Sequence, residues 1–182
     1  MNWQIDPTHS HLSFAVRVLS VSTTRGRFHA LRGHLNIDEQ NPANSWVEAE
    51  VEAASIDTHI KLRDAHLRSA AFFDVKQYPT ISFTSTNVEH VGGQNYQVTG
   101  NLSMHGVTKP ITFDVAYHGQ STLMGARAGL TAKATINRND FGVGRGAAVQ
   151  LVASSIATIE IDLEAVQQAV EVREAAVIAT AH

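Results

Sequence analysis

Residues 12–18 read Leu-Ser-Phe-Ala-Val-Arg-Val, and this stretch decides the fold class. Its large apolar residues stand at every second position, which is the period of a β-strand that buries one face. The same alternation recurs along most of the chain, in residues 47–53, 81–83, 96–102, 111–117, 130–136 and 159–163. Together with the N-terminal segment and residues 28–37, the pattern predicts eight or nine strands.

Turn-forming residues separate these strands. Asn41-Pro42-Ala43-Asn44, Gly92-Gly93-Gln94-Asn95 and residues 105–110 are hairpin or short-loop signals. Short connections favour antiparallel neighbours, and a sheet of so many strands must protect its edges. We therefore predict an all-β fold, an antiparallel closed β-barrel of about eight strands, although a sandwich would satisfy the same pattern.

Two segments lose the two-residue period. Residues 60–74 are rich in helix formers, and Asp64 and Ser69 are candidate N-caps for two short helices. This insertion has the size of a lid over a barrel mouth, or it is a mere connector. Residues 165–182 have helical spacing and much alanine. We predict a barrel domain over residues 1–165 and a C-terminal helical extension over 166–182.

Composition limits the function classes. The chain has 182 residues, a formal net charge of -3, no basic run and no cysteine. These features argue for one domain, against nucleic-acid binding, and against disulfides or thiolate chemistry. Residues 1–7 lack a secretory signal, and no apolar run approaches the roughly 20 residues of a transmembrane helix. We expect a soluble, cytoplasmic protein, or a periplasmic one if this is a processed chain.

No motif for catalysis or cofactor binding emerges. A Gly-x-Ser-x-Gly elbow is missing, and the glycine-rich residues 142–146 lack the Lys-Ser/Thr of a phosphate loop. We interpret that segment as a flexible loop at the barrel rim, preceding a strand-like stretch rather than opening a helix. The sequence therefore predicts no enzyme activity, no catalytic residue and no cofactor.

Histidines are the best candidates for metal ligands. His9 and His11 are two residues apart and would share one face of a strand, a spacing compatible with metal binding. A third ligand is not singled out among the other histidines, which include His29, His34, His59 and His66. We predict no metal site and keep a histidine-based, metal-dependent enzyme as the alternative.

The inward face of the strands is the positive signal. Seven apolar side chains would line one interior: Phe14, Val16, Phe83, Val98, Leu102, Phe113 and Ile136. The insertion adds three more candidates: Leu67, Phe72 and Phe73. A barrel of about eight strands is near the size that holds one small ligand, although periodicity alone also permits a filled core. Arg63, Asp64 and His66 are candidate contacts for a ligand's polar head group; alternatively, Asp64 caps the helix and Arg63 pairs with a neighbouring acid.

A series of motifs resembles the YceI-like family from the first residues to about residue 165. The motifs appear in order: Trp3-x-Ile5-Asp6-x-x-His9-Ser10, Ser55-Ile56-Asp57-Thr58, Arg63-Asp64-x-His66-Leu67-Arg68-Ser69, Phe72-Phe73-Asp74, Tyr78-Pro79-x-Ile81-x-Phe83, Gly100-x-Leu102, Gly106-Val107-Thr108-Lys109-Pro110 and Arg138-x-Asp140-Phe141-Gly142. The resemblance implies a lipocalin-like barrel around a hydrophobic pocket. It also implies a polyisoprenoid, quinone-tail or fatty-acid-amide guest, and a homodimer as in several relatives.

We therefore predict a protein that binds a long apolar lipid inside its barrel and sequesters or transports it. Two alternatives stay open from the residues alone. One is the histidine-based metal-dependent enzyme. The other is a filled, structural barrel that acts only through its surface, with the C-terminal helix used for assembly.

Overall fold

Eleven strands and two α-helices make up the part of the chain that the computed structural model describes, residues 2–168. The strands are β1 (Asn2–Ile5), β2 (His11–Val18), β3 (Ser22–Phe28), β4 (Leu31–Asn36), β5 (Trp46–Glu52), β6 (Ile56–Asp57), β7 (Thr80–Gly92), β8 (Asn95–Met104), β9 (Val107–Ser121), β10 (Arg127–Asn137) and β11 (Ala153–Gln167). The helices are α1 (Lys61–Arg68) and α2 (Ala147–Val152), with short 3-10 turns η1 (Pro42–Asn44), η2 (Ala53–Ser55) and η3 (Arg138–Phe141).

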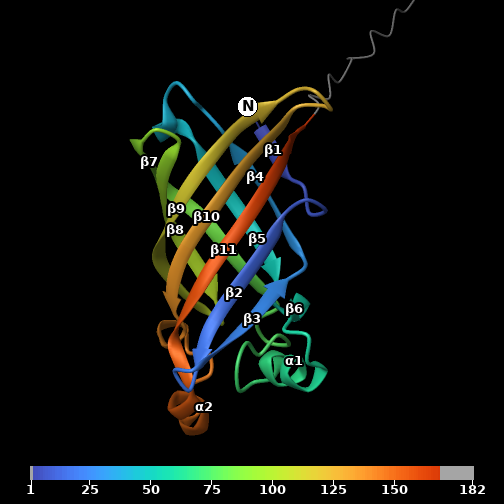
Figure 1. Ribbon diagram of the computed structural model, residues 1–182, viewed down its shortest axis with the longest axis vertical. Coiled ribbons are helices and arrows are strands. Elements are labelled where there is room, and N and C mark those ends of the chain that lie inside the picture. The colour runs from blue at the N-terminus through green and yellow to red at the C-terminus, as the bar shows by residue number, and fades with distance from the viewer. Residues whose placement is uncertain (1, 169–182) are drawn as a thin grey trace, which may run out of the picture.

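Eight of the strands close into an antiparallel barrel, as predicted (Figure 1). The order around the ring is β1-β4-β5-β7-β8-β9-β10-β11, and β11 pairs back onto β1. Closure rests on three residue pairs, among them Trp3 opposite Gln167 and Ile5 opposite Ala165. Each strand of the ring has a partner on both sides, so the ring leaves no long unpaired edge.

The remaining three strands extend the wall beyond the closed ring. β11 is longer than β1 and uses its other half to pair with β2, with Ile161 opposite Leu12. β3 follows β2 in a hairpin and reaches β6 through two pairs only. The sequence count of eight or nine was too low because β6 has two residues and because short turns divide β1 from β2 and β3 from β4.

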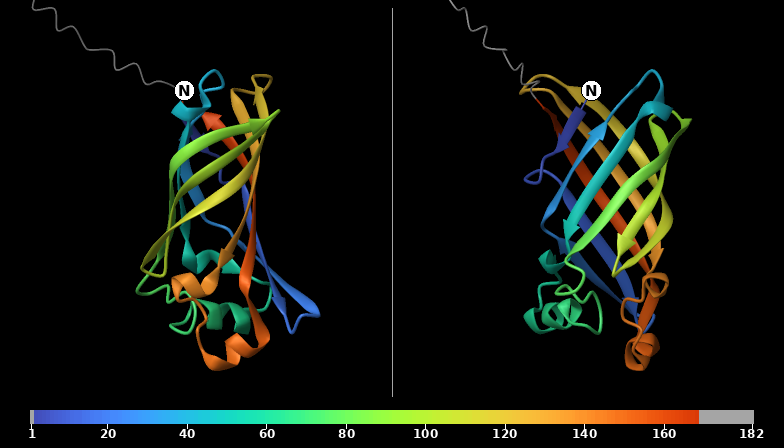
Figure 2. Two further views of the ribbon diagram at one scale, coloured as in Figure 1. Left: turned by 90° about the vertical axis from the view of Figure 1, so that its left-hand side faces the viewer. Right: turned by 180° about the vertical axis from the view of Figure 1, so that it is seen from behind.

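The two ends of the barrel differ (Figures 1 and 2). Because the strands are antiparallel, the β2–β3 hairpin, α1, η3, the β8–β9 turn and α2 all gather at one end, which we call the helical end. The opposite end carries the start of β1, residues 37–45 and the β7–β8 and β9–β10 connections. Neither α-helix of the described residues is long and apolar enough to cross a membrane.

Three groups of buried side chains stabilise the wall, and the smallest joins Phe113 of β9 to Ala132 and Ala134 of β10. The largest group surrounds the closing strand, where Trp3 and Ile5 alternate inward and are almost fully buried. The second group lies at the helical end and joins Leu102 and Ile136 to Phe141 and Val143 of the loop after β10. Burial of a large apolar side chain contributes about 1.5–3 kcal/mol, so these groups hold the strands of the wall together.

The predicted helix caps in the insertion were wrong. Asp64 lies inside α1, whose N-cap position is Ile60. Ser69 ends this helix instead of starting a second one, and its hydroxyl donates to the backbone carbonyl of His66 at 2.6 Å. Residues 70–79 form turns. Acidic and hydroxyl side chains satisfy the sequence rule for an N-cap at several positions of this segment. Only the packing of the helix selects among them.

Two other predictions need correction. The glycine-rich residues 142–146 do form a loop at the rim, but Gly146 is the N-cap position of α2 and the loop therefore opens a helix. Residues 165–167, placed in a C-terminal helix, belong to β11, where Ala165 is fully buried. The rest of that predicted helix, from residue 169 onward, lies outside the described residues.

Candidate functional site

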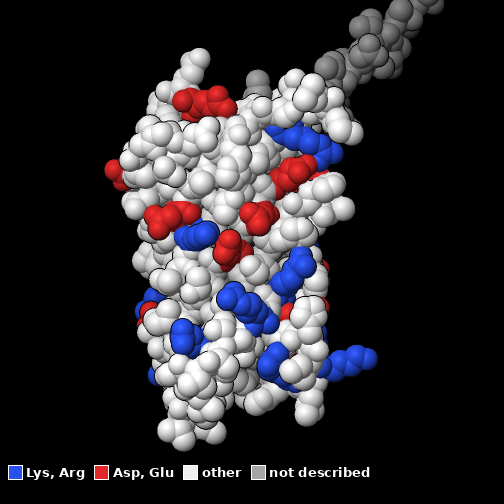
Figure 3. Space-filling view, viewed as in Figure 1, with Lys and Arg blue, Asp and Glu red and all other residues white. Residues whose placement is uncertain are grey.

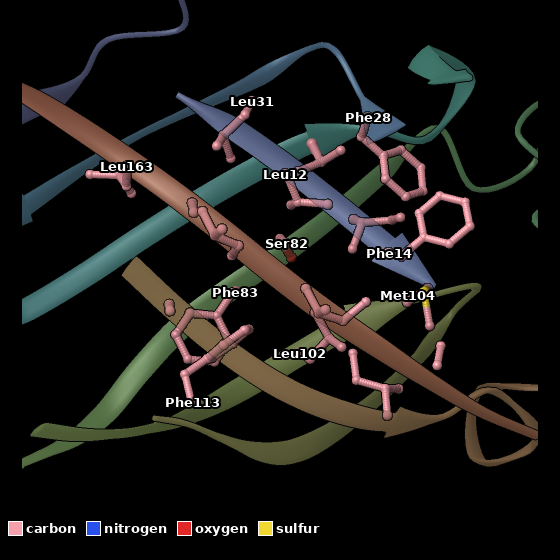
Figure 4. Close-up of a pocket in the computed structure, with 18 of the residues that line it drawn as sticks. Leu12, Phe14, Phe28, Leu31, Ser82, Phe83, Leu102, Met104, Phe113 and Leu163 are labelled. Atoms are coloured by element: carbon pink, nitrogen blue, oxygen red, sulfur yellow. The ribbon is translucent and has the colours of Figure 1, made fainter. Parts of the chain in front are cut away.

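A cavity of about 540 Å³ occupies the interior of the barrel (Figure 4). Its size falls in the range of ligand pockets, roughly 300–1,000 Å³. The lining is almost entirely apolar and extends from Ile37 and Trp46 at one end to Val18 and Val152 at the helical end. The cavity therefore has the shape of a long internal channel rather than a surface cleft.

All ten apolar residues predicted from the sequence line this cavity. Phe14 and Val16 come from β2, Phe83 from β7, and Val98 and Leu102 from β8. Phe113 of β9 and Ile136 of β10 complete the barrel part, and Leu67, Phe72 and Phe73 come from the insertion. Alternate residues of a strand point to the same side of the sheet, which explains why simple periodicity found them.

The sequence prediction missed further lining residues on the same faces. They include Leu12, Phe28, Leu31, Met104 and Leu163, which Figure 4 shows among the other lining side chains. The alternation in residues 12–18 and 159–163 carried the signal for Leu12 and Leu163. Phe28 and Leu31 flank the break between β3 and β4, where the two-residue period is interrupted and the inward face cannot be read.

Aromatic rings join the insertion to the barrel. The ring centroids of Phe14 and Phe28 are 5.6 Å apart, and those of Phe28 and Phe73 are 5.8 Å apart in an edge-on arrangement. Deeper in the barrel, Phe83 and Phe113 are in edge-on contact at 5.2 Å. These distances are favourable for aromatic pairs. The segment after α1 is thereby packed as a cover against the cavity wall.

Polar residues of the insertion have separate positions. Arg63 and His66 both line the cavity at the helical end. The guanidinium of Arg63 is held by Thr58, with Nε donating to Oγ1 at 2.7 Å and Nη2 donating to the carbonyl at 2.8 Å. The ring of His66 meets Phe72 edge-on, with centroids 4.9 Å apart. Arg63 therefore pairs with no acid among residues 2–168, which was the alternative interpretation.

Asp64 is not a lining residue, which contradicts its predicted contact with a head group. Its side chain is buried behind the wall, where Oδ1 accepts hydrogen bonds from the backbone N–H of Thr58 at 2.8 Å and from its hydroxyl at 2.5 Å. Asp64 thus accepts hydrogen bonds from Thr58, and Arg63 donates hydrogen bonds to it. This arrangement fastens α1 to the short strand β6.

Arg138 lines the cavity at the helical end, and the sequence analysis named it only within a motif, not as a candidate site residue. Its buried guanidinium donates to four backbone carbonyls, those of Val143, Gly144, Ala153 and Ser154, at 2.7–3.1 Å. Burial lowers the pKa of Arg138 from its ordinary value. The side chain ties the glycine-rich loop to the start of β11 and so holds α2 at the rim of the cavity.

The opposite end of the cavity has acidic polar groups. The hydroxyl of Tyr117 donates to Glu39 Oε1 at 2.8 Å, and both residues line the cavity beside Asp38. Burial, together with this bond to a carboxylate, raises the pKa of Tyr117 to about 12. The two ends of the cavity therefore offer a guest different charges: arginines at the helical end and carboxylates at the other.

The histidine pair proposed as metal ligands is not assembled. His9 lies in a turn, where Nδ1 contacts Asp6 Oδ2 at 2.8 Å, whereas His11 lies on β2 with its Nδ1 against Arg27. Asp6, His9 and Glu164 do gather their donor atoms, but Arg127 forms ion pairs with both carboxylates. A guanidinium thus already supplies the positive charge of that cluster.

Comparison with known proteins gives consistent matches. The model of the YceI-like domain matches residues 3–165. A UPF0312 protein of Pseudomonas putida is 37% identical over 163 residues, which cover 88% of this chain and 82% of the relative. A UPF0312 protein of Pseudomonas aeruginosa is 38% identical over 137 residues, or 74% of this chain and 71% of the relative.

Solved structures share the fold. BcnA of Burkholderia cenocepacia superimposes with a TM-score of 0.82 and 23% identity, over 88% of this chain and 98% of the other. The YceI protein of Campylobacter jejuni gives 0.74 and 25% identity, over 82% and 88%. A polyisoprenoid binding domain from Saccharophagus degradans, implicated in plant cell wall breakdown, gives 0.71 and 18% identity, over 91% and 98%.

Proposed function

Because the chain belongs to the YceI-like family, we propose that it binds a long apolar lipid, of polyisoprenoid type, inside its barrel and sequesters or transports it. The observation that carries this proposal is the internal channel of about 540 Å³ with its apolar lining. The Saccharophagus degradans domain of the same fold, a polyisoprenoid binding domain, supports the choice of guest class.

The chemistry of the lining favours a hydrocarbon guest. Transfer of each CH₂ from water into the channel favours binding by about 0.8 kcal/mol before ordering costs are subtracted. A polar guest would lose hydrogen bonds to water that Phe83, Val98 and Phe113 cannot replace. Selectivity for apolar chains thus follows from the wall itself and does not need a specific hydrogen-bond partner along the channel.

We propose that the polar head of the guest lies at the helical end. Arg63 is held at the cavity rim by Thr58 and lines the channel together with His66. A guanidinium and an imidazole can both donate hydrogen bonds to a hydroxyl or phosphate oxygen. In this orientation the hydrocarbon tail points along the channel, toward Tyr117.

Native mass spectrometry with organic extraction tests the proposal. We expect an added mass that extracts as a prenyl or acyl lipid, and binding of a twenty-carbon prenyl alcohol by protein that has been stripped of lipid. Val98→Trp fills the channel and lowers occupancy several-fold. Gln97→Trp, at the exposed neighbouring position of β8, is the matched control and retains the guest.

Stripped protein that stays folded and refuses both prenyl and acyl probes would overturn the proposal. Equal loss of binding in the Val98 and Gln97 variants would mean that the guest lies outside the channel. Circular dichroism of both variants separates loss of binding from loss of the barrel.

A further inference from the structure

Exposed apolar side chains gather at the helical end of the barrel. Leu62 of α1, Leu151 of α2 and Val21 of the β2–β3 hairpin are 84%, 83% and 83% exposed. They stand on three separate elements that meet at the same end of the molecule (Figures 1 and 2). Leu19, Ile60 and Val152, beside them in sequence, are exposed as well. Exposed apolar groups gathered in this way are typical of interaction surfaces. Because Leu123 and Met124 are exposed at the opposite end as well, the surrounding charge is what distinguishes the two ends.

The hairpin tip is strained in a way that keeps an apolar residue outward. Leu19 and Ser20 have φ values of 52° and 57°, in the left-handed region, and the Val21 N–H donates to the Val18 carbonyl at 3.2 Å. Two-residue turns of this kind favour Asn and Gly at their central positions. Leucine is costly there for the backbone, and the Leu19 side chain is 63% exposed, so packing offsets little of that cost.

Positive charge surrounds the exposed apolar side chains of the helical end, Leu62, Leu151 and those of the hairpin tip, which we call the apolar tips. Figure 3 shows Lys and Arg on the lower half of the visible face, toward the helical end, and most Asp and Glu on the upper half. Apart from the buried Arg138 and from Arg27, which contacts His11, the cations on the elements of the helical end are Arg17, Arg25, Lys61, Arg63, Arg68, Lys76, Lys109 and Arg145. Within the described residues, none of them forms an ion pair with a carboxylate, whereas Arg32, Arg127 and Lys133 elsewhere do.

The acids of this end offset the cations only in part. Asp64 is buried against Thr58, and Asp57 lies beside His29 at 2.9 Å. Asp74 and Asp140 are the other carboxylates on these elements. The helical end therefore has an excess of positive charge in a chain whose net charge is -3.

The apolar tips are continuous with the internal channel. Val152 is exposed and also lines the cavity, as do Val149 of α2 and Val18 at the base of the hairpin. Leu67, on the same helix as Leu62, lines the cavity from the other side. An apolar path thus leads from the channel wall to the exposed end of the molecule.

We propose that the helical end docks on the surface of an anionic phospholipid bilayer. Leu62, Leu151 and the hairpin tip would enter the headgroup region while the surrounding cations contact lipid phosphates. The helical end of the channel, with the cover formed by the segment after α1, would then face the bilayer, so that an apolar guest moves between membrane and barrel without crossing water. Docking itself needs no guest, and this proposal stands apart from the identity of the lipid carried.

Charge selects this occupant over a second copy of the chain. A twofold contact through the helical end would bring the same cation-rich surface face to face. Such a contact concentrates like charges, whereas a bilayer with anionic headgroups neutralises them. The match of exposed apolar tips with surrounding cations is also typical of segments that lie on membranes.

Vesicle flotation tests the proposal with the whole chain. We expect binding to vesicles of phosphatidylcholine with phosphatidylglycerol, little binding to phosphatidylcholine alone, and release by salt. The double variant Leu62→Ser with Leu151→Ser should lower partitioning at least about tenfold. The matched control is Leu123→Ser with Met124→Ser, at the opposite end, where the side chains are 94% and 86% exposed.

The outcomes are distinct. Loss of flotation in the helical-end variant only, with the control unchanged, supports docking. No flotation of the wild type, equal loss in both variants, or a dimer that the helical-end variant converts to monomer would overturn it. The Val98→Trp variant should still float although it carries less guest. Docking can therefore fail while guest binding stands, and guest binding can fail while docking stands.

Discussion

The ring of Phe14 lies against the backbone of Gly26, its direct cross-strand partner in the β2–β3 hairpin. A Cβ atom built on Gly26 would stand 2.3 Å from Cζ of Phe14 and 2.9 Å from Cγ2 of Thr58. The glycine thus makes room for an aromatic ring that lines the channel and contacts Phe28. The absence of a side chain at Gly26 of β3 therefore helps to shape the cavity.

Gly26→Ala should destabilise the barrel by about 1–3 kcal/mol, because the methyl group forces Phe14 out of its position. Urea unfolding measures this change. Gly129→Ala on β10 is the control, since its nearest neighbour would be 3.8 Å away. In the double variant Gly26→Ala with Phe14→Leu, the two losses should not add. Additive losses would mean that Phe14 and Gly26 do not share the space.

Replacement of Arg138 should loosen the helical end. Arg138→Met removes the donor for four backbone carbonyls, two of them in buried hydrogen bonds, and should cost about 2–4 kcal/mol. Arg138→Lys should recover little, because one ammonium cannot reproduce the planar fork of a guanidinium. Thermal unfolding measures both, with Arg145→Lys at an exposed position as the control. Amide hydrogen exchange should be faster in residues 142–152 of the Arg138→Met variant. Wild-type rates there would contradict the role of Arg138 in holding this segment.

Stability at acid pH should depend on Asp6. The hydrogen bonds to His9 and the Thr8 N–H, and the nearby Arg127, lower its pKa from 3.8 to about 2. A carboxyl whose pKa is lower in the folded state contributes stability above its unfolded pKa, and that contribution is lost as the pH falls from about 4 to 2. Solvent screening reduces the contribution to about 1 kcal/mol.

Asp6→Asn tests this expectation. The variant should be less stable than the wild type at pH 7 and should approach it as the pH falls toward 2, where the wild-type carboxyl is about half protonated. Denaturant unfolding at a series of pH values provides the comparison. Asp114→Asn on the exposed face of β9 serves as the control. A difference between wild type and Asp6→Asn that stays constant from pH 7 to pH 2 would refute the role of this carboxylate.

Alkaline titration should reveal the raised pKa of Tyr117. Its pKa is raised from 10.0 to about 12 by burial and by the bond to Glu39. The wild type minus Tyr117→Phe difference in ultraviolet absorbance should therefore develop near pH 12, and Glu39→Gln should move it lower. Because the folded pKa is the higher one, this residue's contribution to stability is lost between pH 10 and 12. A difference centred at pH 10 would show that Tyr117 is open to water.

Local pattern carried the prediction of the wall. Phe83 and Val98 were placed inward correctly because a strand repeats every two residues and burial follows that repeat. The same reasoning failed for Asp64, since a cap, a lid contact and a buried anchor all use an acid near the start of a helix. It also placed Ala165 in a helix, because a run with alanine and valine fits either period over a few residues.

The sequence by itself determined that this chain forms an antiparallel barrel with an apolar interior, because alternation and turn residues act over short distances. Only the tertiary structure decided how the ring closes, which depends on Trp3 meeting Gln167 across almost the whole chain. It alone also assembled Arg138 with its four carbonyls, and gathered Leu62, Leu151 and Val21 at one end. Contacts between residues far apart in the chain leave no local period, so these features exist only once the strands have paired.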